Sequence, residues 1–384
     1  MDRAARCSGF GVRPAPFCGI LGQLREESGQ MASQNKSKRN RILSWLINLA
    51  GILVFALLLY FGGIEAWQQI VTGDMRYVLA AFAATLLWDL VAAYRWSLIA
   101  NRLAGEPEIC PYRYFFTYHM LGMLMGQVVP VTVGMLGGRP VALSLSQQVP
   151  LRRSALSVFL DKLFDLFLAL MLALPVALYL VGWIERPLAF GLIGGIVLLG
   201  VLLVAWQYEQ TVRLAGRVGS AAAQPLTRLP IIGRRLVRKL PQQLDRLSNG
   251  TVLENGLAVR AFLLTLAMYS LLAVRLIFIA QALRLDIPWY LLFMGICITQ
   301  LALIFSVTPG SLGFLEGGWW AVLSLGGLTL DQFTIFVLGR RAYVLVFTLL
   351  LTLLAFAWIR QSPARLFRAV LEASRRTDNG TRQA

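Results

Sequence analysis

The feature that most constrains this chain is a run of helix-breaking residues between two long apolar stretches. From residue 306 to residue 320 the sequence reads SVTPGSLGFLEGGWW. Lipid offers no water to unpaired N–H and C=O groups, so Pro309, Gly310 and Gly313 at membrane depth require irregular backbone that is shielded by protein or lines a wet cavity. Glu316 adds to this, because an ionised group near the bilayer centre costs at least about 2.5–3.5 kcal/mol. The motif predicts a polar path through a membrane.

Composition sets the class of protein. The chain is 57% hydrophobic and 14% charged, with a mean hydropathy of +0.66, whereas soluble domains are roughly 25% charged. It is therefore predicted to be an all-α polytopic integral membrane protein. The net charge of +17 lies in the flanks of apolar segments, which favours membrane orientation and anionic lipid over nucleic acid. One histidine and four scattered cysteines predict no metal site, cofactor or disulfide framework.

Six apolar runs are long enough to span a bilayer, which takes about twenty residues. They cover approximately residues 42–62, 77–100, 154–180, 188–206, 257–283 and 333–358. Two further apolar regions are interrupted by Pro, Gly and charged residues. These regions are approximately 114–149, with Pro130, Gly134 and Arg139, and 289–328, with the opening motif.

The positive-inside rule predicts how the interrupted regions cross the membrane. Basic residues from Lys36 to Arg41 predict that the N-terminal flank lies in the cytoplasm. Arg152 and Arg153 can lie on the same side only if the first interrupted region is re-entrant and does not cross the membrane. The same argument applies to the second region and the basic C-terminal tail. We therefore expect about six full spans plus two oppositely oriented re-entrant helical hairpins, the pattern of an inverted repeat. The alternative is that each region is an ordinary pair of kinked helices.

The predicted organisation is one membrane domain between basic tails. A basic N-terminal tail at 1–40 is expected to be disordered, and Met31 is a second plausible start. The transmembrane domain is expected at 41–359, with a basic cytoplasmic loop at 208–256. A basic cytoplasmic tail at 360–384 follows.

Ionisable residues within apolar runs are the candidate site. Asp161 and Asp165 have i,i+4 spacing, so both carboxylates lie on one helix face and need a neighbouring cation or proton. Lys162 can pair with Asp165, and Arg139 is another candidate partner. Arg guanidinium suits phosphate through its bidentate fork, so Arg139 and Lys162 are candidates to accept a phosphate headgroup.

The second half of the chain contributes further charges. Glu316 needs a cation, for which we favour Arg340 over Arg341, and Arg275 lies deep in its span, where it could complete a cavity wall. Asp89 and Arg95 are interpreted instead as a packing pair or an interface anchor. The alternative for the whole set is that these charges are fixed ion pairs that hold broken helices together.

Three motifs carry a resemblance to a known family. They are Pro130, Gly134 and Arg139; Asp161, Lys162 and Asp165; and Pro309, Gly310, Gly313 and Glu316 with the late Arg340 and Arg341. From about residue 41 to residue 358 the chain resembles the flippase-like membrane domain of lysylphosphatidylglycerol synthases, also called the multiple peptide resistance factor flippase domain.

The resemblance implies a function in lipid transport. The implied partners are membrane lipids, either an anionic phospholipid or a polyprenyl-phosphate lipid, with a lipid-modifying enzyme or a second copy of the chain as further candidates. The implied location is the bacterial cytoplasmic (inner) membrane, with both termini cytoplasmic. We expect no enzymatic activity; the alternatives are an integral-membrane transferase that uses Asp161, Asp165 or Glu316 as a base, or an accessory subunit for a lipid-modifying enzyme.

Overall fold

The computed structural model describes residues 60, 67–105, 108–128, 134–202, 204, 255–305 and 308–360. All regular structure within these ranges is helical. The elements are α2 (Met75–Ala104), α3 (Tyr112–Val128), the π-helical turn η1 (Gly134–Gly138), α5 (Arg139–Gln147), α6 (Leu151–Leu180), a helix at Arg186–Leu202, α9 (Asn255–Ala282), α10 (Trp289–Phe305), the 3-10 turn η2 (Pro309–Ser311), α11 (Phe314–Leu323) and α12 (Leu330–Ile359).

The ends of the long helices follow from local chemistry. Asp74 caps α2 by accepting a hydrogen bond from the backbone N–H of Arg76, and Gly105 ends the helix with a positive φ of 75°, which glycine adopts without a Cβ penalty. At the start of α12, Thr329 and Gln332 form a reciprocal capping box. Such caps satisfy backbone groups that a helix end would otherwise leave unpaired.

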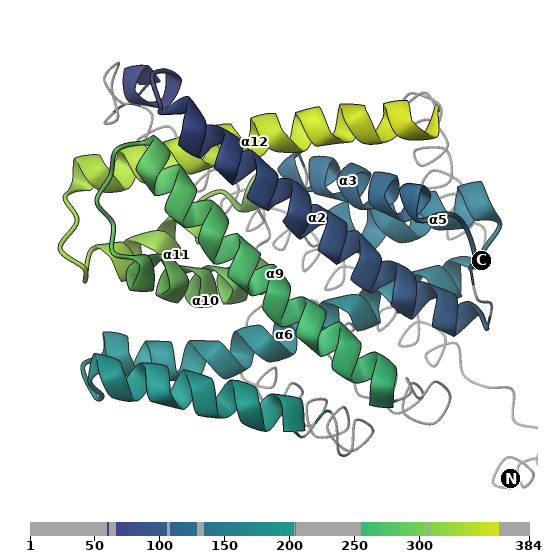
Figure 1. Cartoon of the computed structure of the whole chain (residues 1–384), viewed down its shortest axis with the longest axis horizontal. Helices are drawn as coiled ribbons and strands as arrows, with labels where there is room; N and C mark the ends of the chain where they lie inside the picture. The colour runs from purple at the N-terminus through teal and green to yellow at the C-terminus, as the bar shows by residue number, and fades with distance from the viewer. Residues whose placement is uncertain are drawn as a thin grey trace, which may run out of the picture. The chain divides into compact units, whose positions relative to one another are not determined.

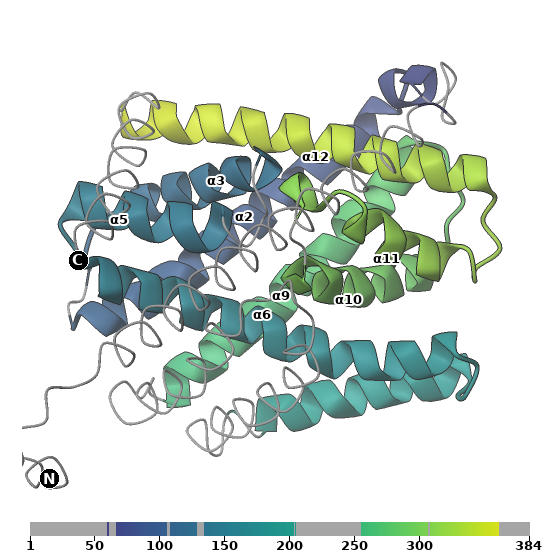
Figure 2. The same ribbon diagram turned by 180° about the vertical axis from the view of Figure 1, so that it is seen from behind.

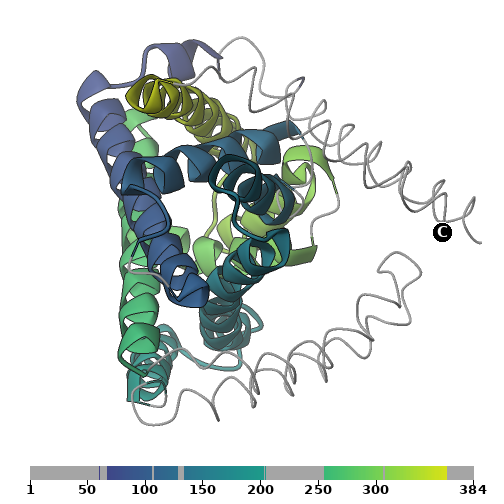
Figure 3. The same ribbon diagram turned by 90° about the vertical axis from the view of Figure 1, so that its right-hand side faces the viewer.

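The long helices pack around a shared apolar core. α2 and α9 lie side by side over much of their length, as Figures 1 and 3 show from two directions. α6 contacts α2, α9 and α10, and α12 contacts α3. The largest core cluster includes Leu168, Phe262, Leu276 and Phe336, all nearly inaccessible, whereas Leu349 and Leu353 on α12 are about half exposed. Exposed leucines on a long apolar helix suit contact with lipid.

The first interrupted region folds as two helical pieces that pack on each other. α3 contacts both η1 and α5 (Figure 2). Gly134 makes this approach possible, because a Cβ at that position would lie 2.5 Å from the backbone N of Gly126 on α3. Pro130, which the sequence placed at the tip of this region, lies outside the described residues.

The second interrupted region is likewise a pair of packed helices, α10 and α11, joined through η2. Gly310 and Gly313 have φ values of 56° and 83°, a region that is strained for residues with a side chain. Glu316 Oε2 accepts the backbone N–H of Gly313 at 2.7 Å and so ties down the start of α11. Gly310 and Gly313, which the sequence predicts as hairpin residues, lie where the chain passes from α10 to α11. The re-entrant course of this region stays a prediction.

The structure confirms an α-helical membrane protein. Within the described ranges, four helices have the length and apolar composition to cross a membrane. They are Met75–Ala104, Leu151–Leu180, Gly256–Ala282 and Leu330–Ile359, and they match four of the six predicted spans. The predicted span at 188–206 coincides with a shorter apolar helix, Arg186–Leu202, and the span at 42–62 lies almost entirely outside the described residues. The six-span count stays a prediction.

Candidate functional site

Arg95 of α2 joins the two carboxylates of α6. Its Nε donates to Asp161 Oδ1 at 2.8 Å and its Nη1 donates to Asp165 Oδ1 at 2.7 Å, with a further bond from Nη1 to Thr265 Oγ1 on α9 at 2.5 Å. Asp165 Oδ2 accepts from Lys162 Nζ at 2.7 Å. The i,i+4 carboxylates therefore share one cation, as their spacing on a helix face requires.

The same network continues to the first interrupted region. Asp161 Oδ2 accepts from Arg139 Nη1 at 3.2 Å. Arg139 Nη2 contacts His119 Nδ1, and His119 Nε2 lies 2.9 Å from Asp89 Oδ1. The guanidinium of Arg139 also lies 5.5 Å from the ring centroid of Trp96. One buried polar chain thus links α2, α3, α5, α6 and α9.

Two sequence-based interpretations are corrected here. Arg95 and Asp89 do not form a pair: Arg95 binds Asp161 and Asp165, and Asp89 binds His119. Arg95 is also fully buried, so it does not extend to the membrane interface. The sequence argument considered only how close Arg95 lies to the end of its helix. Its environment is set instead by Asp161 and Asp165, which α6 brings opposite it.

Glu316 has one clear cationic partner. Arg341 Nε donates to Glu316 Oε1 at 2.5 Å and its Nη1 donates to the Gly310 carbonyl at 3.1 Å. The preference for Arg340 as the partner was wrong: adjacent residues point about 100° apart around a helix, and it is Arg341 that forms the ion pair with Glu316. Arg340 instead lies with its guanidinium 5.7 Å from the ring centroid of Trp319.

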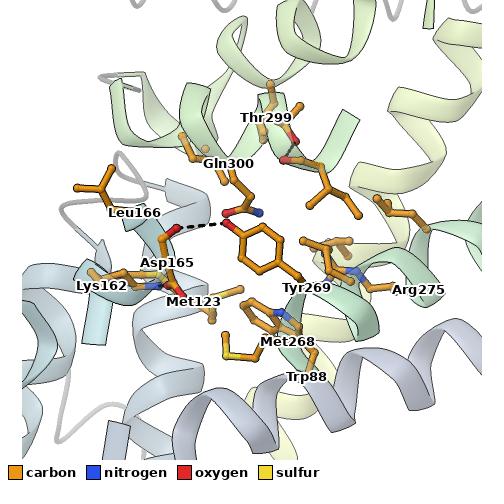
Figure 4. Close-up of a pocket in the computed structure, with 18 of the residues that line it drawn as sticks. Trp88, Met123, Lys162, Asp165, Leu166, Met268, Tyr269, Arg275, Thr299 and Gln300 are labelled. Atoms are coloured by element: carbon orange, nitrogen blue, oxygen red, sulfur yellow. Dashed lines mark hydrogen bonds and ion pairs between the residues drawn. The ribbon is translucent and has the colours of Figure 1, made fainter. Parts of the chain in front are cut away.

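A cavity of about 360 Å³ lies among the helices. Its wall is mostly apolar, and its charged residues are Lys162, Asp165, Arg275, Arg340 and Arg341. In Figure 4, Lys162 and Asp165 lie to one side of Tyr269 and Arg275 to the other.

Both interrupted regions border this cavity. Gln127, Met135 and Leu136 come from the first, and Gly310 and Leu315 from the second. Thus the two broken segments border one cavity although Met135 and Gly310 are 175 residues apart in sequence. Irregular backbone at membrane depth is tolerated where it is shielded or lines a cavity.

The sequence from residue 47 to residue 370 matches the family described as the lysylphosphatidylglycerol synthase TM region. The chain belongs to this family. No curated protein matches it. Membership agrees with the resemblance drawn from the three motifs, and it agrees with the apolar helices in making the chain an integral membrane protein that associates with lipid.

The structure places the charged candidate residues in two groups. Lys162, Asp165, Arg275, Arg340 and Arg341 line the cavity. Arg139, Asp161 and Glu316 are held in ion pairs and are not part of its lining. The phosphate contact expected of Arg139 therefore stays untested, and its bond to Asp161 gives it a structural partner.

Sequence reasoning did not single out several polar groups of this region as parts of a site. His119 links Arg139 to Asp89, and Gln127, Thr299 and Gln300 add polar atoms to the cavity wall. The available signal was their position within apolar runs, since ionisable and amide groups at membrane depth usually face the protein interior.

Proposed function

We propose that the chain binds a phosphate-containing lipid, an anionic phospholipid or a polyprenyl phosphate, and moves it across the membrane. The headgroup would occupy the cavity while the acyl or prenyl chains stay in lipid. The observation that supports this most is a largely apolar cavity with four basic side chains on its wall, Lys162, Arg275, Arg340 and Arg341. Basic groups at membrane depth are costly and usually mark a substrate pathway.

The two interrupted regions support a transport role. In many transporters the substrate site lies near the bilayer midplane, between inverted repeats that each contain a broken helix. Here the segments around Met135 and Gly310 both border the cavity, which favours the re-entrant arrangement and, with it, six full spans. Movement of one hairpin against the other would open the headgroup site to either side.

The family description supports action on lipid, and our proposal is transport rather than catalysis. We propose a bacterial inner membrane as the location, because the family resemblance implies it. The basic flanks of the apolar runs favour cytoplasmic positions for both termini. A lipid-modifying enzyme would be the natural partner, because it would supply or consume the transported lipid. A second copy of the chain is the other candidate partner.

Proteoliposomes test this function. Vesicles containing the protein and a trace of fluorescent phosphatidylglycerol, or in a parallel set fluorescent phosphatidic acid, should lose more fluorescence to an external quencher than empty vesicles. Gln300→Trp, which fills the cavity, should reduce this movement, whereas Leu349→Trp on the exposed face of α12 should not. Movement of neither lipid above the level in empty vesicles would refute transport, and a lipid product of altered mass would identify a transferase.

A further inference from the structure

Charge balance around the cavity points to the kind of headgroup it takes. The basic side chains of the cavity wall and of the adjoining network are Arg95, Arg139, Lys162, Arg275, Arg340 and Arg341, and the acidic ones are Asp89, Asp161, Asp165 and Glu316. With a neutral His119, six positive charges face four negative charges. Two positive charges are left for a ligand to neutralise.

The geometry assigns that surplus to two side chains. Lys162 is matched by Asp165, and Arg341 is matched by Glu316. Within the described residues no carboxylate lies within ion-pair distance of Arg275 or Arg340. Asp89 attracts Arg275 only from beyond such contact.

Both arginines have hydrogen-bond donors that an anion could accept from. Arg275 is 7% exposed, and the Nε atoms of both Arg275 and Arg340 are buried without a hydrogen-bond partner in the part of the chain that the structure describes. Each guanidinium lies near an aromatic ring: Arg275 is 5.8 Å from the Trp88 ring centroid, and Arg340 is 5.7 Å from that of Trp319. Such contacts help to hold a guanidinium, but they leave its charge and its N–H donors available.

The two cations also act on each other. Arg275 and Arg340 line the same cavity, and each repels the charge of the other. A pair of like charges in a site of low dielectric is unfavourable unless an anion lies between them. A single negative charge would remove only half of the surplus.

We propose that Arg275 and Arg340 form a two-arginine subsite that selects a headgroup with two negative charges, a phosphate monoester or a diphosphate, over a phosphodiester with one. This inference rests on the proposed function, because it names the headgroup that the cavity would hold. Arginine forks match the several oxygens of a terminal phosphate bidentately. A phosphodiester presents fewer free oxygens and less charge.

Native mass spectrometry of the full chain in detergent tests this selection. Dioleoylphosphatidic acid, a monoester, should bind about tenfold or more tightly than dioleoylphosphatidylglycerol, a diester, given the energy of one charge-assisted hydrogen bond. Arg275→Gln and Arg340→Gln should each abolish this preference. Arg260→Gln and Arg360→Gln, which change exposed arginines at the ends of the same two helices, should retain it.

Thermal unfolding without added lipid gives a second readout. A surplus cation costs free energy when no ligand is bound, so Arg275→Gln should melt at the same temperature as the parent protein or higher. A large drop in melting temperature would show that Arg275 has a structural partner and would overturn the subsite.

The outcomes separate this inference from the proposed function. Equal binding of the two lipids, together with transport of phosphatidylglycerol, would refute the two-charge subsite and leave transport standing. Tight binding of phosphatidic acid without transport of either lipid would do the reverse. Competition by excess inorganic pyrophosphate would support the subsite and show that the phosphate groups suffice. Binding that excess pyrophosphate does not displace would count against it, because the lipid would then be held through its acyl chains.

Discussion

At the scale of single residues, Arg95 stabilises the arrangement of α2, α6 and α9. Replacing it with glutamine leaves Asp161 and Asp165 on one helix face without the cation that they share. Removing one partner of a buried ion pair typically costs about 3–5 kcal/mol of unfolding free energy. We therefore expect Arg95→Gln to lower the melting temperature and the yield of monodisperse protein.

The control for this experiment lies on the same helix. Arg76 is exposed in the first turn of α2, so Arg76→Gln should change the melting temperature little. Equal melting temperatures for the two variants would contradict a stabilising role for Arg95. Arg275→Gln is not expected to lower stability. The three variants together therefore distinguish an arginine that stabilises the fold from one that is proposed to bind a ligand.

The pairing of Glu316 with Arg341 gives a second prediction at this scale. Glu316→Gln and Arg341→Gln should each reduce stability and lipid movement, and the double variant should be less impaired than the sum of the two, because each single change leaves one charge without its partner. Recovery will be partial, since both residues also bond the backbone of the hairpin at Gly313 and Gly310.

A double-mutant cycle measures this coupling. The interaction energy between positions 316 and 341 should be about 0.5–3 kcal/mol, and larger than the value between positions 316 and 340. A larger interaction energy between positions 316 and 340 would show that Arg340, and not Arg341, is the partner of Glu316. If Glu316→Gln were as active as the parent protein, the charge of Glu316 would not be needed for function. The backbone conformation at Pro309 and Gly310 would then be the feature of the motif to test.

At the scale of elements, close packing of broken helices depends on glycine at one contact. A Cβ at Gly134 would lie 2.5 Å from the N and 2.8 Å from the Cα of Gly126, both backbone atoms of α3, which cannot move aside as a side chain can. We expect Gly134→Ala to destabilise the protein by about 1–3 kcal/mol and to impair lipid movement. Thermal melting and the proteoliposome assay measure the two effects.

The neighbouring Gly137 is the matched control. Apart from its chain neighbours and its own helix backbone, no atom of the described residues lies within 4 Å of a Cβ built there. Alanine is intrinsically more favourable than glycine in a helical segment by about 0.5–1 kcal/mol. Gly137→Ala should therefore be neutral or stabilising. If both alanine variants behaved alike, the packing of η1 on α3 would not be the constraint.

At the scale of the whole molecule, the topology can be tested by labelling. We expect a cysteine at position 152, in a background without native cysteines, to react with an impermeant maleimide only from the cytoplasmic side. A cysteine within residues 234–239, which lie outside the described ranges, should react from the same side. Labelling of position 152 from outside would mean that the first interrupted region crosses the membrane completely.

Much of the fold follows from the sequence because lipid leaves few alternatives. A chain of this composition must satisfy its backbone within helices, so the apolar runs near residues 77–100, 154–180, 257–283 and 333–358 predicted helices whose bounds the structure extends by a few residues. The helix breaks near Gly134 and Gly310 were also predictable, because glycine and proline interrupt helices through local backbone effects. Lys162 with Asp165 was also predictable, because their i,i+3 spacing fixes their proximity on one helix.

The sequence by itself determined which segments are helical, where they break and which charges enter the membrane, because these properties depend on residues close together in the chain. Only the tertiary structure decided that Arg95 binds both α6 carboxylates, that Glu316 meets Arg341, and that Arg275 and Arg340 share a cavity. Partner choice depends on the rotation and depth of each helix against its neighbours, which side-chain packing over the whole domain sets. No local pattern records those angles, so adjacent arginines on α12 could have different roles without any sign of it in the sequence.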